Sequence, residues 1–362
     1  MEVVRLPLVF QSHQTGLADS VEWLPERGQE IAGQYTILSD MLSSGNFGAT
    51  FLCQPTNSPY STQLCLKVMH RDRDKLDSSL DEVRTLRRIR GADASHAVQH
   101  LIDFFYWRER LIIVTEYYGC SLDGFCESES RGALLAFFLP DGIRALAQQM
   151  LAALAYLHGL GITHTDVKPA NICVRQPTIF TLIDFGSAVY EGSTRNSRMQ
   201  PLDHRAPEVI LGVPWGAAVD VWSLGCVLVE MLLNQVLFQA DLPEGVLASQ
   251  IALAGPLPES LRARTNPSMY AIIANAPAVR VPRLEGSTLV VPHPTSLPEL
   301  LNGITGDATL LKLLDALLTM DPDERPTPAD ALRHAALVGI GWPPRDDGMN
   351  RFMRPFTPFY AE

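Results

Sequence analysis

The strongest constraint on this chain is a polar run, residues 162–171 (ITHTDVKPAN), which is followed later by an Asp-Phe-Gly motif that begins at Asp184. Asp166 can accept the proton of a hydroxyl group, and Lys168 can steady a γ-phosphate. Asn171 and Asp184 supply the hard oxygen ligands that Mg²⁺ prefers. Phosphoryl transfer explains all four residues together. The alternative, an ordinary polar turn between a helix and a strand, leaves their coincidence unexplained.

A glycine-bearing turn earlier in the chain fits the same chemistry. Residues 43–48 (SSGNFG) join two strand-like runs, and glycine lets backbone N–H groups approach phosphate oxygens closely. A tight hairpin without a ligand is an equally simple interpretation of such a turn. The phosphate interpretation gains weight from Lys67, because a lysine on an apolar strand otherwise lies at an edge or on the surface. Glu82, on the following helix, can face Lys67 and hold its ammonium group over a nucleotide's phosphates.

Strand and helix patterns divide the chain into two parts. The first holds five strand-like runs, 35–42, 49–54, 63–69, 97–107 and 111–118, and one helix with apolar residues on one face at Leu76, Leu80, Val83, Leu86 and Ile89. The second is mainly helical, with helices predicted from Pro140 to Gly159 and over 219–233, 310–318 and 328–337. The helix at 219–233 is apolar on nearly all sides and should be buried. Residues 255–300 are rich in proline and are predicted to form an irregular surface segment.

Charge and cysteine usage narrow the function class. Asp and Glu total 40 against 29 Lys and Arg, a net charge of -11, which argues against nucleic-acid binding through bulk charge and fits a basic protein partner. No apolar run approaches the roughly 20 residues that a membrane span needs. The six cysteines form no C-x-x-C pair, which is typical of reduced thiols in an intracellular protein of the cytoplasm or nucleus.

With these motifs in order, the chain resembles the eukaryotic protein kinases over about residues 35–337. The glycine turn is similar to their phosphate loop, residues 164–171 to their catalytic loop and residues 184–186 to their magnesium-binding turn. Residues 206–208 (APE), 220–225 (DVWSLG) and 321–325 (DPDER) match three further signatures. The resemblance implies that Glu208 and Arg325 form the family's buried ion pair.

The resemblance also implies an architecture. We expect an α+β, two-lobed protein kinase fold, with a five-stranded N-lobe at 35–118 that carries one main helix and a mainly helical C-lobe at 119–338. Residues 1–34 would then be an N-terminal extension, about 241–300 an insertion of the kind found in the CMGC group, and 339–362 a C-terminal tail.

Within the superfamily, the chain is most similar to the CMGC group. Arg205 stands directly before the Ala-Pro-Glu, and His-Thr-Asp at 164–166 together with Asp-Phe-Gly-Ser-Ala at 184–188 resembles the LAMMER (cdc2-like) kinases. Those kinases adjoin the dual-specificity tyrosine-regulated and homeodomain-interacting families. Residues 247–256 fall in the register of the LAMMER helix, but its four central letters are replaced at 249–252. The chain is therefore interpreted as a divergent relative.

The resemblance assigns roles residue by residue. Asp166 would be the catalytic base, assisted by Lys168, with Lys67 and Glu82 as the phosphate-anchoring pair and Asn171 and Asp184 as the magnesium ligands. ATP would lie between the lobes, with its adenine on the backbone between Glu116 and Tyr118 and with Thr115 as gatekeeper. The residues assigned to ATP binding are Ser43, Gly45, Gly48, Thr50, Cys65, Lys67, Glu116 and Tyr118.

Four residues depart from the family pattern. Ser43 replaces the first phosphate-loop glycine, and Thr50 stands where a valine over adenine is usual. Pro201 replaces a threonine whose hydroxyl bonds the catalytic Asp and Lys in the family. Thr165 replaces the arginine that in most kinases grips a phosphate on the activation segment, so we expect activity without phosphorylation of that segment.

These observations predict a monomeric protein kinase that uses Mg²⁺ and ATP. It would transfer the γ-phosphate to Ser or Thr hydroxyls of proteins, with Tyr as an additional acceptor, and would prefer basic or arginine-rich substrates. Direct nucleic-acid and membrane partners are not expected. An alternative is a catalytically weak pseudokinase that acts as a nucleotide-binding scaffold. A small-molecule kinase is disfavoured by the Ala-Pro-Glu element and the insertion.

Overall fold

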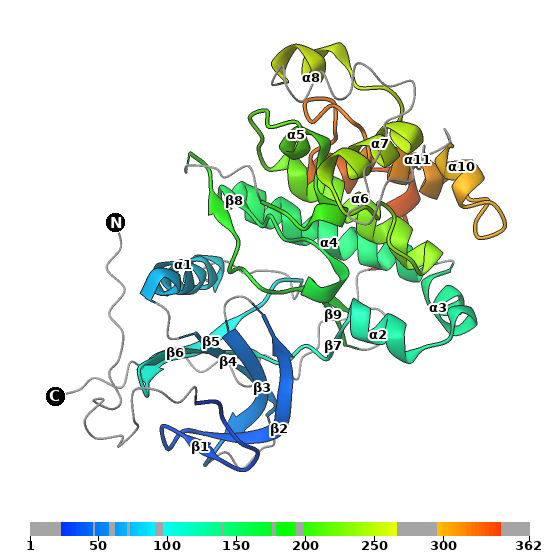
Figure 1. Cartoon of the computed structure of the whole chain (residues 1–362). Helices are drawn as coiled ribbons and strands as arrows, with labels where there is room; N and C mark the ends of the chain where they lie inside the picture. The colour runs from blue at the N-terminus through cyan, green and yellow to red at the C-terminus, as the bar shows by residue number, and fades with distance from the viewer. Residues whose placement is uncertain are drawn as a thin grey trace.

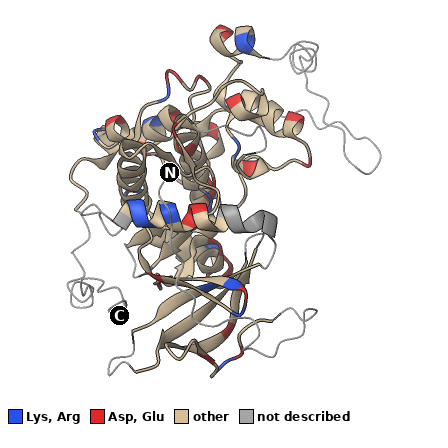
Figure 2. Cartoon of the chain, turned by 90° about the vertical axis from the view of Figure 1, so that its left-hand side faces the viewer, with Lys and Arg blue, Asp and Glu red and all other residues tan. Residues whose placement is uncertain are grey.

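The computed structural model describes residues 23–45, 48–57, 62–70, 73–90, 97–139, 141–175, 179–192, 199–265 and 295–341, except for the side chains of 73–78 and 90. Within these ranges the chain forms two lobes, an antiparallel sheet in the lower part of Figure 1 and a group of helices above it. Helix α1 (Arg73–Arg90) lies across the molecule between the two, as Figure 2 shows. The predicted two-lobed α+β architecture is present.

The sheet of the first lobe has the strand order β1-β2-β3-β4-β6-β5. The strands are β1 (Glu30–Ile31), β2 (Tyr35–Ser44), β3 (Gly48–Pro55), β4 (Leu64–Met69), β5 (Leu101–Trp107) and β6 (Arg110–Glu116), and each neighbouring pair is antiparallel. All five predicted strands are found. The additional edge strand β1 comes from the segment that the sequence suggested was an extension. The run predicted at 97–107 also differs, because β5 begins at Leu101 and residues 97–99 lie outside the sheet.

The segment before β1 packs against the sheet through aromatic side chains. The ring of Trp23 meets that of Trp107 edge-on, with their centroids 4.7 Å apart. The Arg108 guanidinium lies over both rings, 5.2 Å from the Trp23 centroid and 4.5 Å from that of Trp107. These cation–π contacts anchor residues 23–34 on the lobe.

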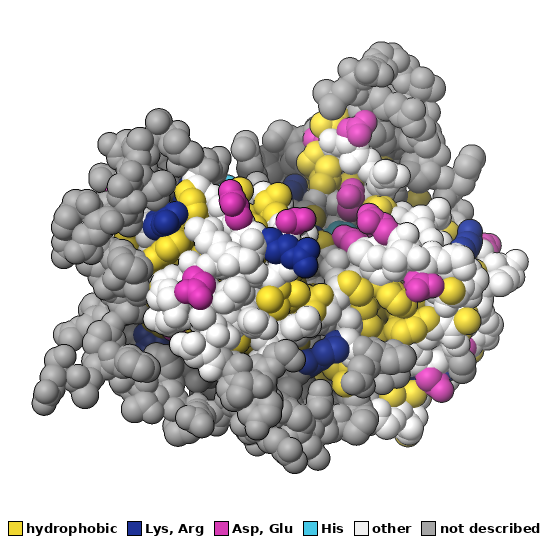
Figure 3. Space-filling model, turned by 90° about the horizontal axis from the view of Figure 1, so that it is seen from below, with side chains coloured by type: hydrophobic (Ala, Val, Ile, Leu, Met, Phe, Trp, Pro, Cys, Tyr) yellow, Lys and Arg dark blue, Asp and Glu magenta, His cyan; other side chains and the backbone are white. Residues whose placement is uncertain are grey.

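Figure 3 shows the molecule from below, where basic side chains stand apart from one another on the described surface.

Strand β6 is buried from Arg110 to Thr115 because both faces of the sheet are covered there. Ile112 and Val114 pack into the cluster on the outer face of the sheet. Leu111 and Ile113 point the other way and join the main core, to which α1 contributes Val83 among others. Side chains alternate across a strand, so a strand that is covered on both faces favours apolar residues at successive positions. This explains the uninterrupted run of apolar residues at 111–114.

The second lobe is organised around α6 (Ala218–Leu233), in which every residue from Val219 to Leu233 is buried, as predicted. Around it lie the helices α2 (Leu122–Ser128), α3 (Arg131–Phe138), α4 (Gly142–Gly159), α5 (Pro207–Ile210), α7 (Pro243–Ala254), α11 (Ala308–Leu317) and α12 (Pro328–Ala331). Gly225 brings α6 close to the end of α11, because a Cβ at this position would lie 2.9 Å from a methyl carbon of Leu318.

Two predicted segments of the second lobe differ in detail. The helix expected over 328–337 is two short pieces, α12 and the 3₁₀ turn η4 (Ala335–Leu337), because the side chain of His334 accepts the N–H of Ala336 and starts a new turn. The segment 255–300 contains α8 (Glu259–Arg264) and α10 (Leu297–Leu300), and residues 266–294 lie outside the described ranges. Among the helices that the structure describes, none has the length and apolar character to cross a membrane.

Candidate active site

Strand β4 presents Lys67 to the space between the lobes. Leu64, Leu66 and Val68 point into the outer core, so the alternating residue Lys67 faces the opposite side. Its Nζ lies 2.9 Å from each carboxylate oxygen of Glu82 on α1 and 3.0 Å from Oδ1 of Asp184. The ion pair expected between Lys67 and Glu82 is thus formed, and Asp184 joins it.

Lys67 and Asp184 hold each other ionised, whereas burial raises the pKa of Glu82 despite the nearby Lys67 ammonium. Burial by itself would lower the pKa of Lys67, but the carboxylates of Glu82 and Asp184 outweigh it and raise that pKa above its ordinary value. Burial would raise the pKa of Asp184, whereas the Lys67 ammonium and the backbone N–H of Gly186 lower it. At neutral pH the site therefore holds an ammonium group beside an ionised Asp184.

The catalytic-loop residues follow the two-residue strand β8 (Ile162–Thr163). Nζ of Lys168 lies 3.0 Å from Oδ2 of Asp166, and the amide nitrogen of Asn171 donates to the same oxygen at 2.7 Å. Asn171 is the last residue of the 3₁₀ turn η2 (Pro169–Asn171), which leads into β9 (Ile172–Val174). The ion pair between Lys168 and Asp166 forms without the family threonine hydroxyl that Pro201 lacks.

The backbone of this loop is held by Asp220 from the buried helix α6. Its two carboxylate oxygens accept the N–H groups of His164 and Thr165, each at 2.8 Å. Thr165 has φ 64°, a left-handed conformation that is uncommon for a β-branched residue. The N–H of Asp166 donates to Nδ1 of His164, so the other ring nitrogen carries the proton and donates to the carbonyl of Ile183. The helical core thereby sets the position of Asp166.

The donor set fits a magnesium ion. The amide nitrogen of Asn171 bonds two oxygens of Asp166, so its amide oxygen faces away from them. In Asp184, Oδ1 contacts Lys67 and accepts the N–H of Gly186, whereas Oδ2 has no hydrogen-bond partner among the described residues. One amide oxygen and one carboxylate oxygen match the hard ligands of Mg²⁺, which usually keeps several waters and substrate phosphates as its other ligands.

The residues assigned to ATP lie on or next to four neighbouring strands, β2, β3, β4 and β6. Thr50 pairs with Ser43 on one side and with Lys67 on the other, and Cys65 pairs with Thr115 on β6. Burial raises the pKa of Cys65 to about 11, so its thiol stays neutral. The N–H of Gly45 bonds the carbonyl of Gly48 at 3.0 Å and closes the turn, whose residues 46 and 47 lie outside the described ranges.

Gly48 also has a packing role. A Cβ at this position would lie 2.2 Å from the carbonyl oxygen of Val68 on β4.

At the proposed adenine contact, the Tyr118 side chain turns into the protein, where its hydroxyl accepts the N–H of His100 at 2.9 Å. Burial and the nearby Glu116 raise the pKa of Tyr118. Only backbone groups of Tyr118 therefore remain to meet a nucleotide.

The activation segment is the stretch from Ser187 to the Ala-Pro-Glu motif, and its described part contacts both lobes. Strand β11 (Val189–Tyr190) pairs with β8, and the hydroxyl of Thr165 donates to the carbonyl of Ser187 at 2.7 Å. The hydroxyl of Tyr190 lies 3.1 Å from that of Thr85 on α1. Three other hydroxyl residues of this segment, Ser193, Thr194 and Ser197, lie outside the described ranges.

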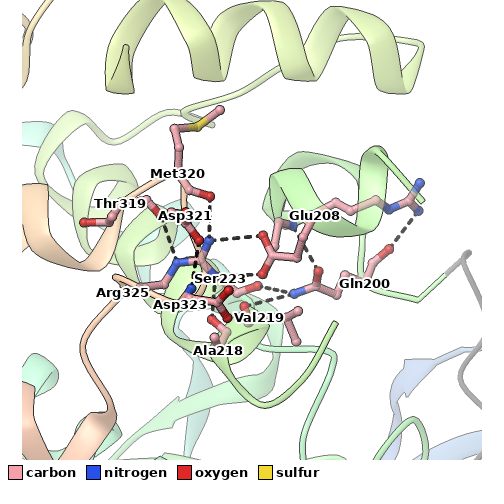
Figure 4. Close-up of polar contacts among 12 residues, drawn as sticks. Gln200, Glu208, Ala218, Val219, Ser223, Thr319, Met320, Asp321, Asp323 and Arg325 are labelled. Atoms are coloured by element: carbon pink, nitrogen blue, oxygen red, sulfur yellow. Dashed lines mark hydrogen bonds and ion pairs between the residues drawn. The ribbon is translucent and has the colours of Figure 1, made fainter. Parts of the chain in front are cut away.

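At the end of the activation segment, Glu208 and Arg325 form the expected ion pair, with nitrogen–oxygen distances of 2.9 and 3.1 Å (Figure 4). Sequence reasoning missed Gln200, which lies beside this pair. It has φ 70°, its amide nitrogen donates to Val219 and Ser223 of α6, and its amide oxygen accepts the N–H of Ala206. No motif in the sequence marks this glutamine.

Comparison with known proteins agrees with this geometry. Residues 37–337 match the protein kinase domain family, so the chain belongs to that family. The chain is 30% identical over 330 residues to the dual specificity protein kinase lkh1 of Schizosaccharomyces pombe, covering 84% of this chain and 47% of lkh1. It is also 30% identical over 340 residues to the DYRK-family kinase pom1 of the same organism, covering 91% of this chain and 30% of pom1.

The chain thus spans less than half the length of either relative. A crystal structure of a kinase domain superposes with a TM-score of 0.75 and 23% identity, covering 88% of this chain and all of that domain. The predicted protein kinase fold and the predicted likeness to dual-specificity CMGC relatives are confirmed.

Proposed function

We propose that the protein transfers the γ-phosphate of Mg-ATP to Ser and Thr hydroxyls of protein substrates, with Tyr as a further acceptor. The observation that carries this proposal is the joint geometry of Lys67, Glu82 and Asp184, with Asp166 and Asn171 bonded to each other nearby. The dual specificity named for lkh1 supports the inclusion of tyrosine.

In this proposal each residue has a distinct role. The carboxylate of Asp166 takes the proton of the acceptor hydroxyl as the hydroxyl oxygen attacks the γ-phosphorus, and the bond from phosphorus to the β–γ bridging oxygen breaks. Lys168, 3.0 Å from Asp166, steadies the γ-phosphate. Lys67, held by Glu82, anchors the other phosphates. Asn171 and Asp184 would hold magnesium, which would neutralise phosphate charge.

A labelling experiment distinguishes the proposed kinase activity from the alternative pseudokinase function. Incorporation of labelled phosphate from ATP into a basic protein is measured for the native chain, Asp184→Asn and the surface control Asp141→Asn. We expect incorporation by the native chain and by the control, and loss of about 10²-fold or more in Asp184→Asn because a magnesium ligand is weakened. Equal labelling by the native chain and Asp184→Asn would favour the scaffold.

Substrate preference and location are further parts of the proposal. Glu230 lies close to both Asp123 and Asp203, since it adds to the effect of burial in raising the pKa of each, and Lys168 lies near Asp123. Such charges favour a basic peptide. All six cysteines are free thiols, which fits a reducing cytoplasm or nucleus. Initial rates on matched acidic and basic peptides at low ionic strength test the preference, and equal rates would contradict it.

A further inference from the structure

Residues 97–99 lie outside the first-lobe sheet and beside the strand that leads into the magnesium-binding turn. Val98 forms a parallel bridge with Leu182, the last residue of β10 (Phe180–Leu182). The N–H of Leu182 donates to the carbonyl of Ala97 at 2.8 Å, and the N–H of Gln99 donates to the carbonyl of Leu182 at 2.9 Å. These backbone bonds fix the register, so Gln99 comes to lie next to Asp184.

The side chain of Gln99 links two residues of the site. Its amide oxygen accepts the backbone N–H of Asp184 at 3.0 Å, and its amide nitrogen donates to the hydroxyl oxygen of Thr115 at 3.1 Å. A backbone N–H can only donate, so the amide oxygen must face Asp184 and the nitrogen must face Thr115. Thr115 is buried, and its backbone pairs with Cys65, two positions before Lys67 on β4.

The bonded N–H belongs to a residue in an unusual conformation. Asp184 has φ 64°, a region that residues other than glycine rarely adopt. In this conformation its carboxylate reaches Lys67 at 3.0 Å. A partner that holds the N–H of Asp184 therefore favours the arrangement in which the carboxylate faces Lys67.

We propose that Gln99 is a positioning residue that couples Thr115 to Asp184 and keeps Asp184 oriented for a magnesium–nucleotide complex. The role in metal orientation rests on the proposed function. The coupling itself is a property of this chain and is measured without catalysis.

The first test replaces Gln99 with methionine, which has a similar length and cannot form either hydrogen bond. The matched control is Gln149→Met, because the amide oxygen of Gln149 accepts a backbone N–H in the same way, from Phe180 at 2.9 Å. Amide hydrogen exchange of the full chain is followed by nuclear magnetic resonance. We expect protection of the Asp184 amide to fall at least tenfold in Gln99→Met and to stay unchanged in Gln149→Met. Unchanged protection in Gln99→Met would overturn the proposal.

The second test changes Thr115, the other hydrogen-bond partner of the Gln99 side chain, and leaves Gln99 in place. Thr115→Val keeps the side-chain shape and removes the oxygen that receives the Gln99 amide, whereas Thr115→Ser keeps it. We expect Thr115→Val to lower Asp184 protection, Thr115→Ser to preserve it, and the double variant Gln99→Met/Thr115→Val to match Gln99→Met alone. Effects that multiply in the double variant would show that the two residues act independently and would overturn the coupling.

The proposed role of Gln99 in orienting Asp184 for magnesium is measured separately. Binding of a fluorescent ADP analogue is titrated with Mg²⁺, and we expect the half-saturating Mg²⁺ concentration to rise three- to tenfold in Gln99→Met but not in Gln149→Met. If the exchange results hold and the Mg²⁺ dependence does not move, Gln99 positions the backbone alone and the metal-orienting part of the proposal is wrong. If the native chain transfers no phosphate, the proposed function fails while both measurements stay interpretable.

Discussion

Two clusters in this molecule join a cation to carboxylate at nearly the same distances and for different purposes. In the cleft, Lys67 lies 2.9 Å from both oxygens of Glu82. In the helical lobe, Arg325 meets Glu208 at 2.9 and 3.1 Å. The side chains of Arg325 and Glu208 are 0% exposed, whereas Lys67 is 18% and Asp184 is 34% exposed.

The difference lies in what surrounds each cation. All five N–H groups of the Arg325 guanidinium are used, two on Glu208 and three on the carbonyls of Ala218, Thr319 and Met320, and the group also lies over the ring of Trp222 (Figure 4). The partners of Lys67 are Glu82 on α1 and Asp184 in the turn after β10, so its geometry depends on elements that belong to both lobes. We infer that the buried Arg325 pair holds the helical lobe together, because loss of either partner would leave a buried charge unpaired, and that the Lys67 cluster is placed for the proposed reaction.

The largest expected effect is the loss of activity at the cleft without loss of fold. Lys67→Met should lower the rate of phosphoryl transfer by about 10²- to 10³-fold, because it removes a charged donor to the phosphates. Asp166→Asn should cost about 10²- to 10⁴-fold by removing the base. Single-turnover rates and thermal denaturation are measured beside Lys312→Met, an exposed lysine on α11. Full activity in either cleft variant would refute the mechanism.

The second prediction concerns the buried pair of Arg325 and Glu208, where we expect a loss of stability. Arg325→Met should lower the free energy of unfolding by about 3–5 kcal/mol, because it leaves the Glu208 carboxylate buried without its partner. The matched control is Arg333→Met, whose ion pair with Asp330 is exposed and should contribute at most about 1 kcal/mol. Urea denaturation measures both. A loss below about 1 kcal/mol in Arg325→Met would mean that the two clusters do not differ as described.

A smaller effect is expected where the activation segment contacts α1, the helix that carries Glu82. Tyr190→Phe removes the hydroxyl that lies 3.1 Å from Thr85, a hydrogen bond of about 0.5–1.5 kcal/mol. If this bond holds α1 in place, kcat/KM should fall by about two- to tenfold. Tyr156→Phe is the control, because its hydroxyl bonds the carbonyl of Ile89 at the far end of the same helix. A larger loss of activity in Tyr156→Phe than in Tyr190→Phe would place the important anchor elsewhere.

The smallest expected effect concerns phosphorylation. The hydroxyl of Thr165 is already bonded to the carbonyl of Ser187, and Lys67 already reaches Glu82, so the described site is assembled without a phosphate receptor. Purified protein is treated with phosphatase, its mass is checked, and initial rates are compared. We expect rates within about twofold. A fall of tenfold, roughly 1.4 kcal/mol, would reveal a phosphate switch.

The sequence predicted the parts of the molecule whose meaning lies in residue type and spacing. Lys67, Glu82, Asp166, Asn171 and Asp184 could be found because few other reactions need these groups in this order. The buried helix at 219–233 could be found because its apolar residues leave no polar face. The same reasoning placed Glu208 with Arg325 through the family resemblance.

Other features depend on distant partners and leave no local pattern. Gln99 and Gln200 are single amides, and their roles arise only where the fold brings Asp184 and Ser223 beside them. Strand β1 has two residues, too few for any periodicity, and the position of the preceding segment depends on Trp23 meeting Trp107. These contacts are tertiary, so local sequence could not predict them.

The pair formed by Glu208 and Arg325 also has a consequence for synthesis. The two residues are 117 positions apart, as are Lys67 and Asp184. At about 5–20 residues per second on the ribosome, roughly 6 to 23 s pass between their emergence. Lys67 and Asp184 can therefore meet first. At that stage the carboxylate of Glu208 still lacks the Arg325 guanidinium as its hydrogen-bond donor. During that interval the helical lobe is incomplete, and its apolar helix α6 is the segment most exposed to aggregation or to capture by chaperones.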